Sequence, residues 1–263
     1  MQKRFSDQVA LVTGAGGDIG LATALRLAEE GASIALLDMN EEKLNAAKSK
    51  VEAKGVRAEG YLCDVTSAEK VESTIAKIVS DFGKIDLLFN NAGYQGAFAP
   101  VHKYDAADFA KVMDINVTGA FCVLKAVSEH MSSRKAGSIV NMASMAGVGG
   151  PPNMCAYAAS KFAVVGLTET ASKDLAPYNI RVNAVSPGLM GPGFMWDRQV
   201  QMQSETNTQY FSTDPKVTEK QMIGGVPLRR CGSIEEIPGV VCSLLSNDFS
   251  YVTGVNIRIS GGE

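Results

Sequence analysis

The sequence predicts one α/β domain over residues 1–263, built around a doubly wound parallel sheet of about seven strands. Two observations predict it. Short apolar runs recur without polar alternation, which indicates strands buried on both faces. Segments with helical periodicity separate them, as crossovers between parallel strands require. The expected strands are VALVT (9–13), SIALL (33–37), GYLC (60–63), IDLLF (85–89), SIVNM (138–142), IRVNAV (180–185) and NIRI (256–259).

The segments between the first strands are expected to be amphipathic helices. Residues 21–30, 41–54 and 68–82 place apolar side chains three and four positions apart, with charged residues opposite. This spacing is typical of a helix that buries one face. Because strand and helix alternate along nearly the whole chain, a single domain is predicted rather than two.

One segment, from about residue 188 to 226, breaks this alternation. It holds prolines, glycines and aromatic residues among polar ones, with no strand pattern and only a weak helical pattern. Irregular segments of this length are uncommon in compact domains unless they are functional. We therefore expect the segment to cover a substrate site, and a surface insertion without such a role is the alternative.

The composition excludes several classes of protein. A net charge of −3, with no run of Lys or Arg longer than Arg229-Arg230, gives no basis for nucleic-acid binding. The five cysteines include no C-x-x-C pair, so neither a disulfide framework nor a metal site is expected. Residues 1–8 lead into only five strand-like residues, too few for a signal peptide or membrane span, so a cytoplasmic location without membrane contact is expected.

Two helical segments are expected to contact other copies of the chain. Residues 155–175 carry small or apolar side chains on several sides rather than along one stripe. Small residues let a second helix approach closely. We therefore predict a homo-oligomer whose interfaces include residues 155–175 and 107–130.

The glycine-rich stretch TGAGGDIG (13–20) follows the first predicted strand. Ligands of open α/β sheets lie beyond the carboxyl ends of the strands, and a helix beginning near Ile19 would direct free N–H groups at a phosphate there. Gly14, Gly16 and Gly17 would let the backbone approach a dinucleotide without Cβ atoms. A tight turn that binds nothing is the alternative.

Asp38 and Met39 end the second predicted strand. A carboxylate at this place can accept hydrogen bonds from the ribose hydroxyls of a dinucleotide, and it repels the additional phosphate of NADP. Because no Lys or Arg directly follows, NAD is the predicted cofactor. The alternative is that Asp38 only caps the helix at 41–54.

Tyr157 and Lys161 are four residues apart on a predicted helix, so their side chains share one face. A nearby ammonium favours the phenolate, which leads us to expect a lowered pKa for Tyr157 and a role in acid–base catalysis. Ser144 stands just after the fifth predicted strand and can hydrogen-bond the same substrate oxygen.

Taken together, these residues resemble the short-chain dehydrogenase/reductase family, whose fold is a single Rossmann-type domain. The likeness extends over nearly the whole chain, and its motifs occur in the same order at the predicted strand ends. They are Thr13-Gly14 with Gly20, Asp64-Val65, Asn90-Asn91-Ala92-Gly93, Asn116, Ser144, Tyr157 with Lys161, and Pro187-Gly188.

The resemblance implies hydride transfer between NAD and an alcohol carbon. The implied catalytic residues are Tyr157 as acid and base, Ser144 holding the oxygen, Lys161 stabilising the phenolate and binding the nicotinamide ribose, and Asn116 holding a proton-relay water. The implied cofactor residues are Gly14, Gly16, Asp18, Ile19, Gly20, Asp38, Met39, Asp64, Val65, Asn90, Ala92, Gly93, Tyr157, Lys161, Pro187 and Gly188.

Two positions depart from the family pattern. The family spaces its glycines as G-x-x-x-G-x-G, and Asp18 replaces the middle glycine. We hypothesise that Asp18 caps the following helix, points away from the phosphates and modestly weakens NAD binding. Pro192 stands where the family often has a Thr that bonds the nicotinamide amide. That contact is therefore expected from another group.

Stretches such as NNAGYQGAFAPV and DLAPYNIRVNAVSPG resemble members of the family that oxidise polyols and form tetramers. This implies a homotetramer that oxidises a polyol such as xylitol to a ketose. A reductase of small ketones or keto-esters and a non-catalytic NAD-binding sensor remain alternatives, and the intact Ser144, Tyr157 and Lys161 argue against the sensor. Predicted substrate contacts are Gln95, Ser144, Asn153, Met154, Met190 and Trp196.

Two of these substrate contacts have structural alternatives. Asn153 follows two prolines and is equally interpretable as a turn residue. Trp196 could cap the pocket or anchor the 188–226 segment to the core. His102 and His130 lie away from the strand ends and are expected to be structural.

Overall fold

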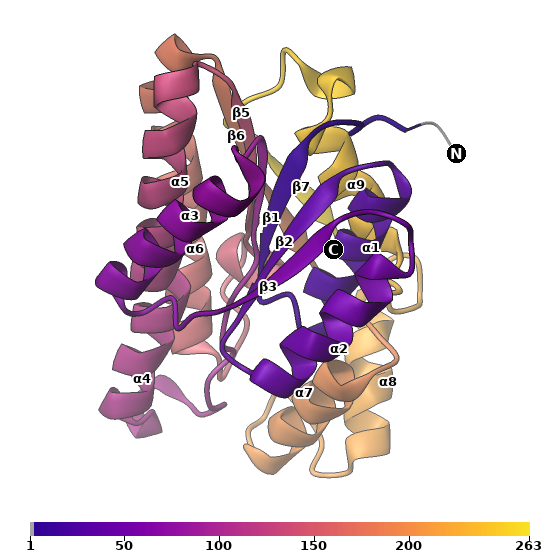
Figure 1. Ribbon diagram of the computed structural model, residues 1–263. Coiled ribbons are helices and arrows are strands. Elements are labelled where there is room, and N and C mark those ends of the chain that lie inside the picture. Colours follow the sequence, from indigo (N-terminus) through magenta and orange to yellow (C-terminus); the bar gives the residue numbers. More distant parts are fainter. Residues whose placement is uncertain (1–2) are drawn as a thin grey trace.

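The computed structural model describes residues 3–263, and Figure 1 shows a central sheet with helices on both faces. Within that range seven strands form one sheet in the order β3-β2-β1-β4-β5-β6-β7, and each neighbouring pair is parallel. The predicted fold class is confirmed. The strands are β1 (Val9–Thr13), β2 (Ser33–Asp38), β3 (Ala58–Leu62), β4 (Leu87–Asn90), β5 (Gly137–Met142), β6 (Ile180–Pro187) and β7 (Asn256–Ile259).

The helices connect successive strands and form two layers. They are α1 (Asp18–Glu29), α2 (Glu41–Glu52), α3 (Ala68–Phe82), α4 (Ala106–Met113), α5 (Ala120–Arg134), α6 (Cys155–Leu175), α7 (Phe194–Glu205), α8 (Pro215–Gly225) and α9 (Glu236–Leu245). A π-helical segment, η2 (Asp114–Gly119), joins α4 to α5. The segment predicted at 107–130 is therefore not one regular helix, because a π-turn interrupts it.

Two apolar cores, one on each face, explain why the strands lack polar alternation. In β1, Ala10 and Val12 pack with α1, α2 and α9, whereas Leu11 packs with α3 and α5. Successive side chains of a strand point to opposite faces, so a strand covered on both sides must be apolar at every position.

The 188–226 segment is more regular than its sequence pattern suggested. It contains α7 and α8, which lie together near the carboxyl edge of the sheet (Figure 1). Asp214 caps α8 by accepting a hydrogen bond from the Lys216 N–H, and Pro215 occupies the first turn. An N-cap Asp followed by Pro is a recognisable helix start, which the sequence analysis missed. It also missed α9, whose residues are mostly buried.

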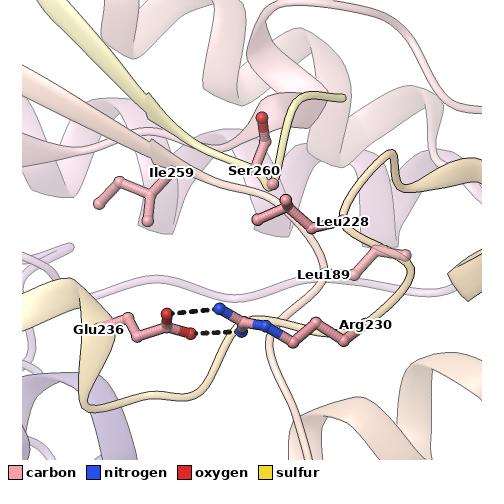
Figure 2. Close-up of a pocket in the computed structure, with 8 residues that line it drawn as sticks. Leu189, Leu228, Arg230, Glu236, Ile259 and Ser260 are labelled. Atoms are coloured by element: carbon pink, nitrogen blue, oxygen red, sulfur yellow. Dashed lines mark hydrogen bonds and ion pairs between the residues drawn. The ribbon is translucent and has the colours of Figure 1, made fainter.

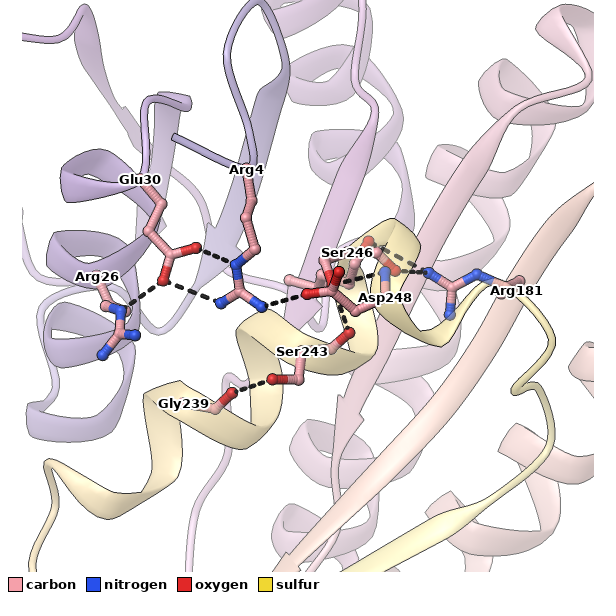
Figure 3. A network of polar contacts seen from close by, with 9 residues as sticks. Arg4, Arg26, Glu30, Arg181, Gly239, Ser243, Ser246 and Asp248 are labelled. Atoms are coloured by element: carbon pink, nitrogen blue, oxygen red, sulfur yellow. Dashed lines mark hydrogen bonds and ion pairs between the residues drawn. The ribbon is translucent and has the colours of Figure 1, made fainter. Parts of the chain in front are cut away.

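Ion pairs fix the amino-terminal segment to the end of α1 and to the turn after α9 (Figure 3). Glu30 is 1% exposed and bonds the Arg4 and Arg26 guanidinium groups, each at 2.5 Å. Arg4 also contacts Asp248 at 2.9 Å. Arg181 donates to the Leu245 and Ser246 carbonyls at the carboxyl end of α9, where a positive charge is favourable. Residues 1–2 of the predicted amino-terminal segment lie outside the described residues.

Other expectations from composition can be compared with residues 3–263. No helix in this range is long and apolar enough to cross a membrane, and the same range holds no group of potential metal-ligating side chains. His130 accepts a hydrogen bond from the Ile85 N–H at 3.2 Å. This contact links α5 to the chain just before β4.

Candidate active site

The loop after β1 packs so closely that glycine is required at two positions. Gly14 has a φ of 62°, a conformation that favours glycine. A Cβ atom on Gly20 would lie 2.2 Å from the Gly14 carbonyl oxygen. The first turn of α1 therefore lies directly against the loop, and its free N–H groups face the space beyond the strand ends.

The expectation that Asp18 caps α1 is wrong. Asp18 is the first helical residue, Gly17 occupies the N-cap position, and no side chain caps this helix. Its helical backbone has no need of a glycine, which explains why the family's middle glycine can be replaced here. The exposed Asp18 carboxylate stays in the first turn, where the helix dipole stabilises negative charge.

The Asp38 carboxylate joins the end of β2 to the glycine loop. Its Oδ2 accepts from the Gly16 N–H at 2.8 Å, and its Oδ1 accepts from the Asn40 N–H at 2.9 Å. Asn40, not Asp38, caps α2 by accepting from the Lys43 N–H at 2.9 Å. The capping alternative for Asp38 is therefore excluded. Lone pairs on both carboxylate oxygens remain for a ligand.

A cavity of about 860 Å³ extends along the carboxyl ends of the first four strands. Its volume lies in the upper range for ligand sites. Predicted cofactor residues that line it are Gly14, Gly16, Asp18, Ile19, Gly20, Asp38, Met39, Asp64, Val65, Ala92 and Gly93. Residues that the sequence analysis did not assign also line it, among them Lys43, Thr66, Asn91, Lys111, Asp114 and Ile115. Asn91 belongs to a family motif without having been given a role, and the others come from helices and loops beside the motifs.

Five predicted cofactor residues do not line this cavity, namely Asn90, Tyr157, Lys161, Pro187 and Gly188. The Asn90 amide nitrogen instead donates to the Ala120 carbonyl at 2.9 Å and the Asn141 side chain at 3.2 Å, which ties β4 to α5 and β5. Pro187 ends β6, and the Gly188 N–H bonds the Ile259 carbonyl at 2.9 Å. The neighbouring Asn91, in contrast to Asn90, lines the cavity.

Tyr157 and Lys161 lie together on α6, as their spacing predicted. The Lys161 Nζ donates to the Met142 carbonyl at the end of β5 at 2.8 Å, and it lies 5.5 Å from the centre of the Tyr157 ring. Ser144 follows β5 and caps a short 3-10 turn. A Cβ on Gly93 would lie 3.7 Å from the Lys161 Nζ, so the loop after β4 reaches the same place.

Asn116 lies in the π-helical segment η2 and is 1% exposed. Its Oδ1 accepts from the Tyr94 N–H at 2.7 Å, and its Nδ2 donates to the Tyr94 carbonyl at 2.8 Å and the Ser160 hydroxyl at 3.0 Å. Single π-turns within helices often occur at functional sites. Here the π-turn places an amide between the loop after β4 and α6.

The pKa of Tyr157 differs from what the positive charge of the neighbouring Lys161 alone predicts. Removal from water raises the pKa of Tyr157, and the Ser144 hydroxyl beside it offsets this only in part. The expected lowering is therefore wrong for the protein without ligand. Burial also lowers the pKa of Lys161 to about 8. The sequence argument counted the neighbouring charge but not the cost of taking both groups out of water.

The predicted substrate residues divide into two sets. Met190 and Trp196 line the cavity, whereas the side chains of Gln95 and Asn153 are bonded to α7. Trp196 also donates to Glu219 of α8 at 3.1 Å and packs with Val200 and Met222, so it holds α7 and α8 together within the 188–226 segment rather than anchoring the segment to the main core. Asn153 has a φ of 67°, which fits its interpretation as a turn residue. Met154 is 3% exposed and packs inside the protein.

A smaller cavity of about 70 Å³ lies between the end of β7 and the start of α9. Arg230 and Glu236 meet across it through two hydrogen bonds of 2.8 Å (Figure 2). None of the predicted site residues lines this cavity.

A family model described as short chain dehydrogenase matches residues 8–203. The chain belongs to this family. It is 38% identical to levodione reductase from Leifsonia aquatica over 99% of this chain and 95% of that protein. It is 35% identical to a 3-oxoacyl-acyl-carrier-protein reductase from Thermotoga maritima, with 98% of each chain covered. Membership makes the chain an oxidoreductase, as predicted.

One solved structure is more similar than these sequence relatives. A NAD+-bound xylitol dehydrogenase is 66% identical and has a TM-score of 0.98, covering 98% of this chain and 100% of that chain. The three relatives are named for different substrates. The comparisons therefore show the family, but they do not agree on one substrate.

We predict that the buried Lys161 makes stability depend on pH. Its pKa is about 8 when folded and about 10.4 in unfolded chains, so the unfolded state holds the extra proton between these values. The free energy of unfolding should therefore rise with pH across this window, by about 1 to 2 kcal/mol. Urea unfolding at pH 7.5 and 9.5 should show this rise relative to Lys161→Met. Parallel pH profiles for the two proteins would contradict the prediction.

Proposed function

We propose that this chain oxidises a secondary alcohol of a polyol such as xylitol to a ketose, with NAD as the cofactor. The observation that carries the substrate proposal is the 66% identity, over nearly the full length, to a xylitol dehydrogenase. The 38% identity to a levodione reductase favours reduction of a small ketone as a second candidate. Both reactions interconvert an alcohol and a ketone.

The residues around the large cavity fit NAD. The Gly14–Gly20 loop lets the backbone approach a pyrophosphate, and the Asp38 carboxylate retains lone pairs for ribose hydroxyls. When bound, the nicotinamide accepts or supplies the hydride. Lys43 also lines the cavity near Asp38, and its positive charge would moderate the repulsion of a second phosphate at this end.

The protein's own residues perform the proton chemistry. Tyr157 takes the hydroxyl proton of the alcohol during oxidation and returns it during reduction. Ser144 holds the reacting oxygen, and Lys161 provides positive charge beside the phenol ring. Because the pKa of Tyr157 is raised, the phenol is protonated in the free enzyme at neutral pH. Oxidation, which needs the phenolate, should therefore be faster at alkaline pH.

Asn116 is suited to holding a water for proton transfer. Both of its amide hydrogens and one lone pair of Oδ1 are used by Tyr94 and Ser160. One lone pair of Oδ1 remains. A water bonded there would lie beside Gly93, close to the Lys161 ammonium.

The 188–226 segment is proposed to cover the substrate within a single domain of residues 1–263. In support, Met190, Pro192 and Trp196 line the large cavity from this segment. The 188–226 segment therefore borders the large cavity. With all five cysteines unpaired, we also propose a cytoplasmic location.

The catalytic proposal predicts that Tyr157→Phe lowers oxidation of the best substrate by about 10²- to 10⁴-fold. The variant lacks only the acid–base hydroxyl, so NADH binding, followed by fluorescence, should change less than about twofold. Substrates should first be compared in a panel of polyols, secondary alcohols and ketones by NADH absorbance. Turnover of ketones but of no polyol would favour the second candidate, and an active Tyr157→Phe enzyme would refute the acid–base assignment.

Cofactor choice is predicted to depend on the charge of Asp38. In Asp38→Asn the repulsion of the NADP phosphate is removed, so the ratio of kcat/KM for NAD over NADP should fall at least about fivefold. Glu41→Gln is the matched control, since it removes an exposed charge from the neighbouring first turn of α2. An equal fall in the control would mean that general electrostatics, not Asp38, sets the preference.

The proposed assembly is a homotetramer. In support, the helices expected at interfaces carry large exposed aromatic residues, with Phe109 38%, Phe121 47% and Phe162 48% exposed. Light scattering should give a mass of four chains, and Phe121→Glu or Phe162→Glu should yield a smaller particle because a charge would be buried. A monomer in the wild type at micromolar concentration would exclude the assembly.

A further inference from the structure

The two amides predicted to contact substrate, Gln95 and Asn153, lie on loops that flank the proposed reaction centre. Gln95 follows Tyr94, whose backbone is bonded to Asn116, and Asn153 just precedes α6, which carries Tyr157. The Ala99 N–H bonds the Asn153 carbonyl at 2.8 Å, so the loops run side by side. Both amides are 8% exposed.

Helix α7 bonds each of these amides. Gln199 accepts from the Gln95 amide nitrogen at 3.2 Å, and Gln203 accepts from the Asn153 amide nitrogen at 2.9 Å. Gln199 and Gln203 are four residues apart, so they share one face of the helix. That face is turned inward at Gln203, which is 2% exposed.

Each of the two amide pairs also contacts a group that can only donate or only accept hydrogen bonds. Arg198 donates to the Gln95 Oε1 at 2.8 Å and to the Gly96 carbonyl at 3.0 Å, and a guanidinium has no acceptor. The Gln95 amide must therefore present its oxygen to Arg198. On the other side, Gln203 donates to the Pro152 carbonyl at 3.4 Å. Since a carbonyl cannot donate, the Gln203 oxygen must face Asn153.

The orientation of both amides leaves one complementary pair of groups. Gln95 uses one hydrogen of its NH₂ on Gln199 and keeps the other. The Asn153 Nδ2 is surrounded by three oxygens, of Gln203, Thr206 and Thr208. Within residues 3–263 no donor bonds the Asn153 Oδ1, and this oxygen is not sealed from solvent. Gln95 thus keeps one N–H and Asn153 one C=O that no described hydrogen bond uses.

We propose that Arg198 and Gln203 are positioning residues that set this donor and acceptor for substrate hydroxyls remote from the reacting carbon. A hydroxyl group both donates and accepts, so a polyol can bond to either group, whereas a simple secondary alcohol has no second hydroxyl to bond. The inference rests on the proposed polyol oxidation. It assigns recognition of the additional hydroxyls to the α7 face rather than to the residues that transfer the proton.

The test compares xylitol with 2-pentanol, which lacks the remote hydroxyls. In Arg198→Met or Gln203→Leu the freed amide can rotate, so KM for xylitol should rise about fivefold, the loss expected for one hydrogen bond. The values of kcat, KM for NAD and kcat/KM for 2-pentanol should change less than about twofold. Arg198→Lys keeps a donor without an acceptor and should restore most of the lost affinity.

Two controls separate this role from general support of the helix. Gln201→Leu changes the same residue type on the exposed face of α7 and should behave as wild type. Gln95→Leu removes the amide through which Arg198 acts, so Gln95→Leu/Arg198→Met should be no worse than Gln95→Leu alone. Thermal unfolding of each variant identifies any that fail to fold; if Arg198→Met or Gln203→Leu does, the other of the two carries the comparison against Gln201→Leu.

The outcomes distinguish the two proposals. If the wild type oxidises no polyol, the proposed function fails and this inference falls with it. If the wild type oxidises xylitol but the variants lose as much activity on 2-pentanol, or the double variant shows additive losses, the proposed function stands. The positioning role of Arg198 and Gln203 would then be wrong.

Discussion

The hydrogen bond from the Lys161 ammonium to the Met142 carbonyl is the contact on which the site depends. It joins the carboxyl end of β5 to the helix that carries Tyr157, and Gly93 approaches the same nitrogen from the loop after β4. One backbone oxygen replaces only part of the water that the ammonium loses, which is why burial lowers the pKa of Lys161 to about 8. In the free enzyme the Met142 carbonyl therefore stabilises the Lys161 ammonium only in part. The Tyr157 ring lies beside this ammonium, and in the proposed complex the nicotinamide ribose would bind there too.

The strand ends and the helices contribute different groups to the candidate site. Backbone geometry around Gly14 and Gly20 and the carboxylate of Asp38 form a rigid cradle at the ends of β1 and β2. The π-helical turn at Asn116 places an amide where a regular helix would pass by. Backbone groups at strand ends are fixed by the sheet, whereas side chains on loops and short helices are freer to vary.

That division bears on why relatives named for different substrates have the same fold. The chain is 38% identical to a levodione reductase and 66% identical to a xylitol dehydrogenase. Helix α7 contacts the loops that carry Gln95 and Asn153 through hydrogen-bonded amides. The orientation of an amide is set by its partners, so a few substitutions on α7 could change which polar groups a substrate meets.

The sequence alone determined the alternation of strands and helices, because burial on two faces makes the central strands mostly apolar at successive positions. It also determined the Tyr157–Lys161 pair, since helical spacing places both side chains on one face. Only the tertiary structure decided the sign of the Tyr157 pKa shift, the inward orientation of Asn90 and the contacts of Gln95 with α7. Desolvation and long-range hydrogen bonds depend on which distant segments pack together. Local sequence patterns do not indicate these contacts.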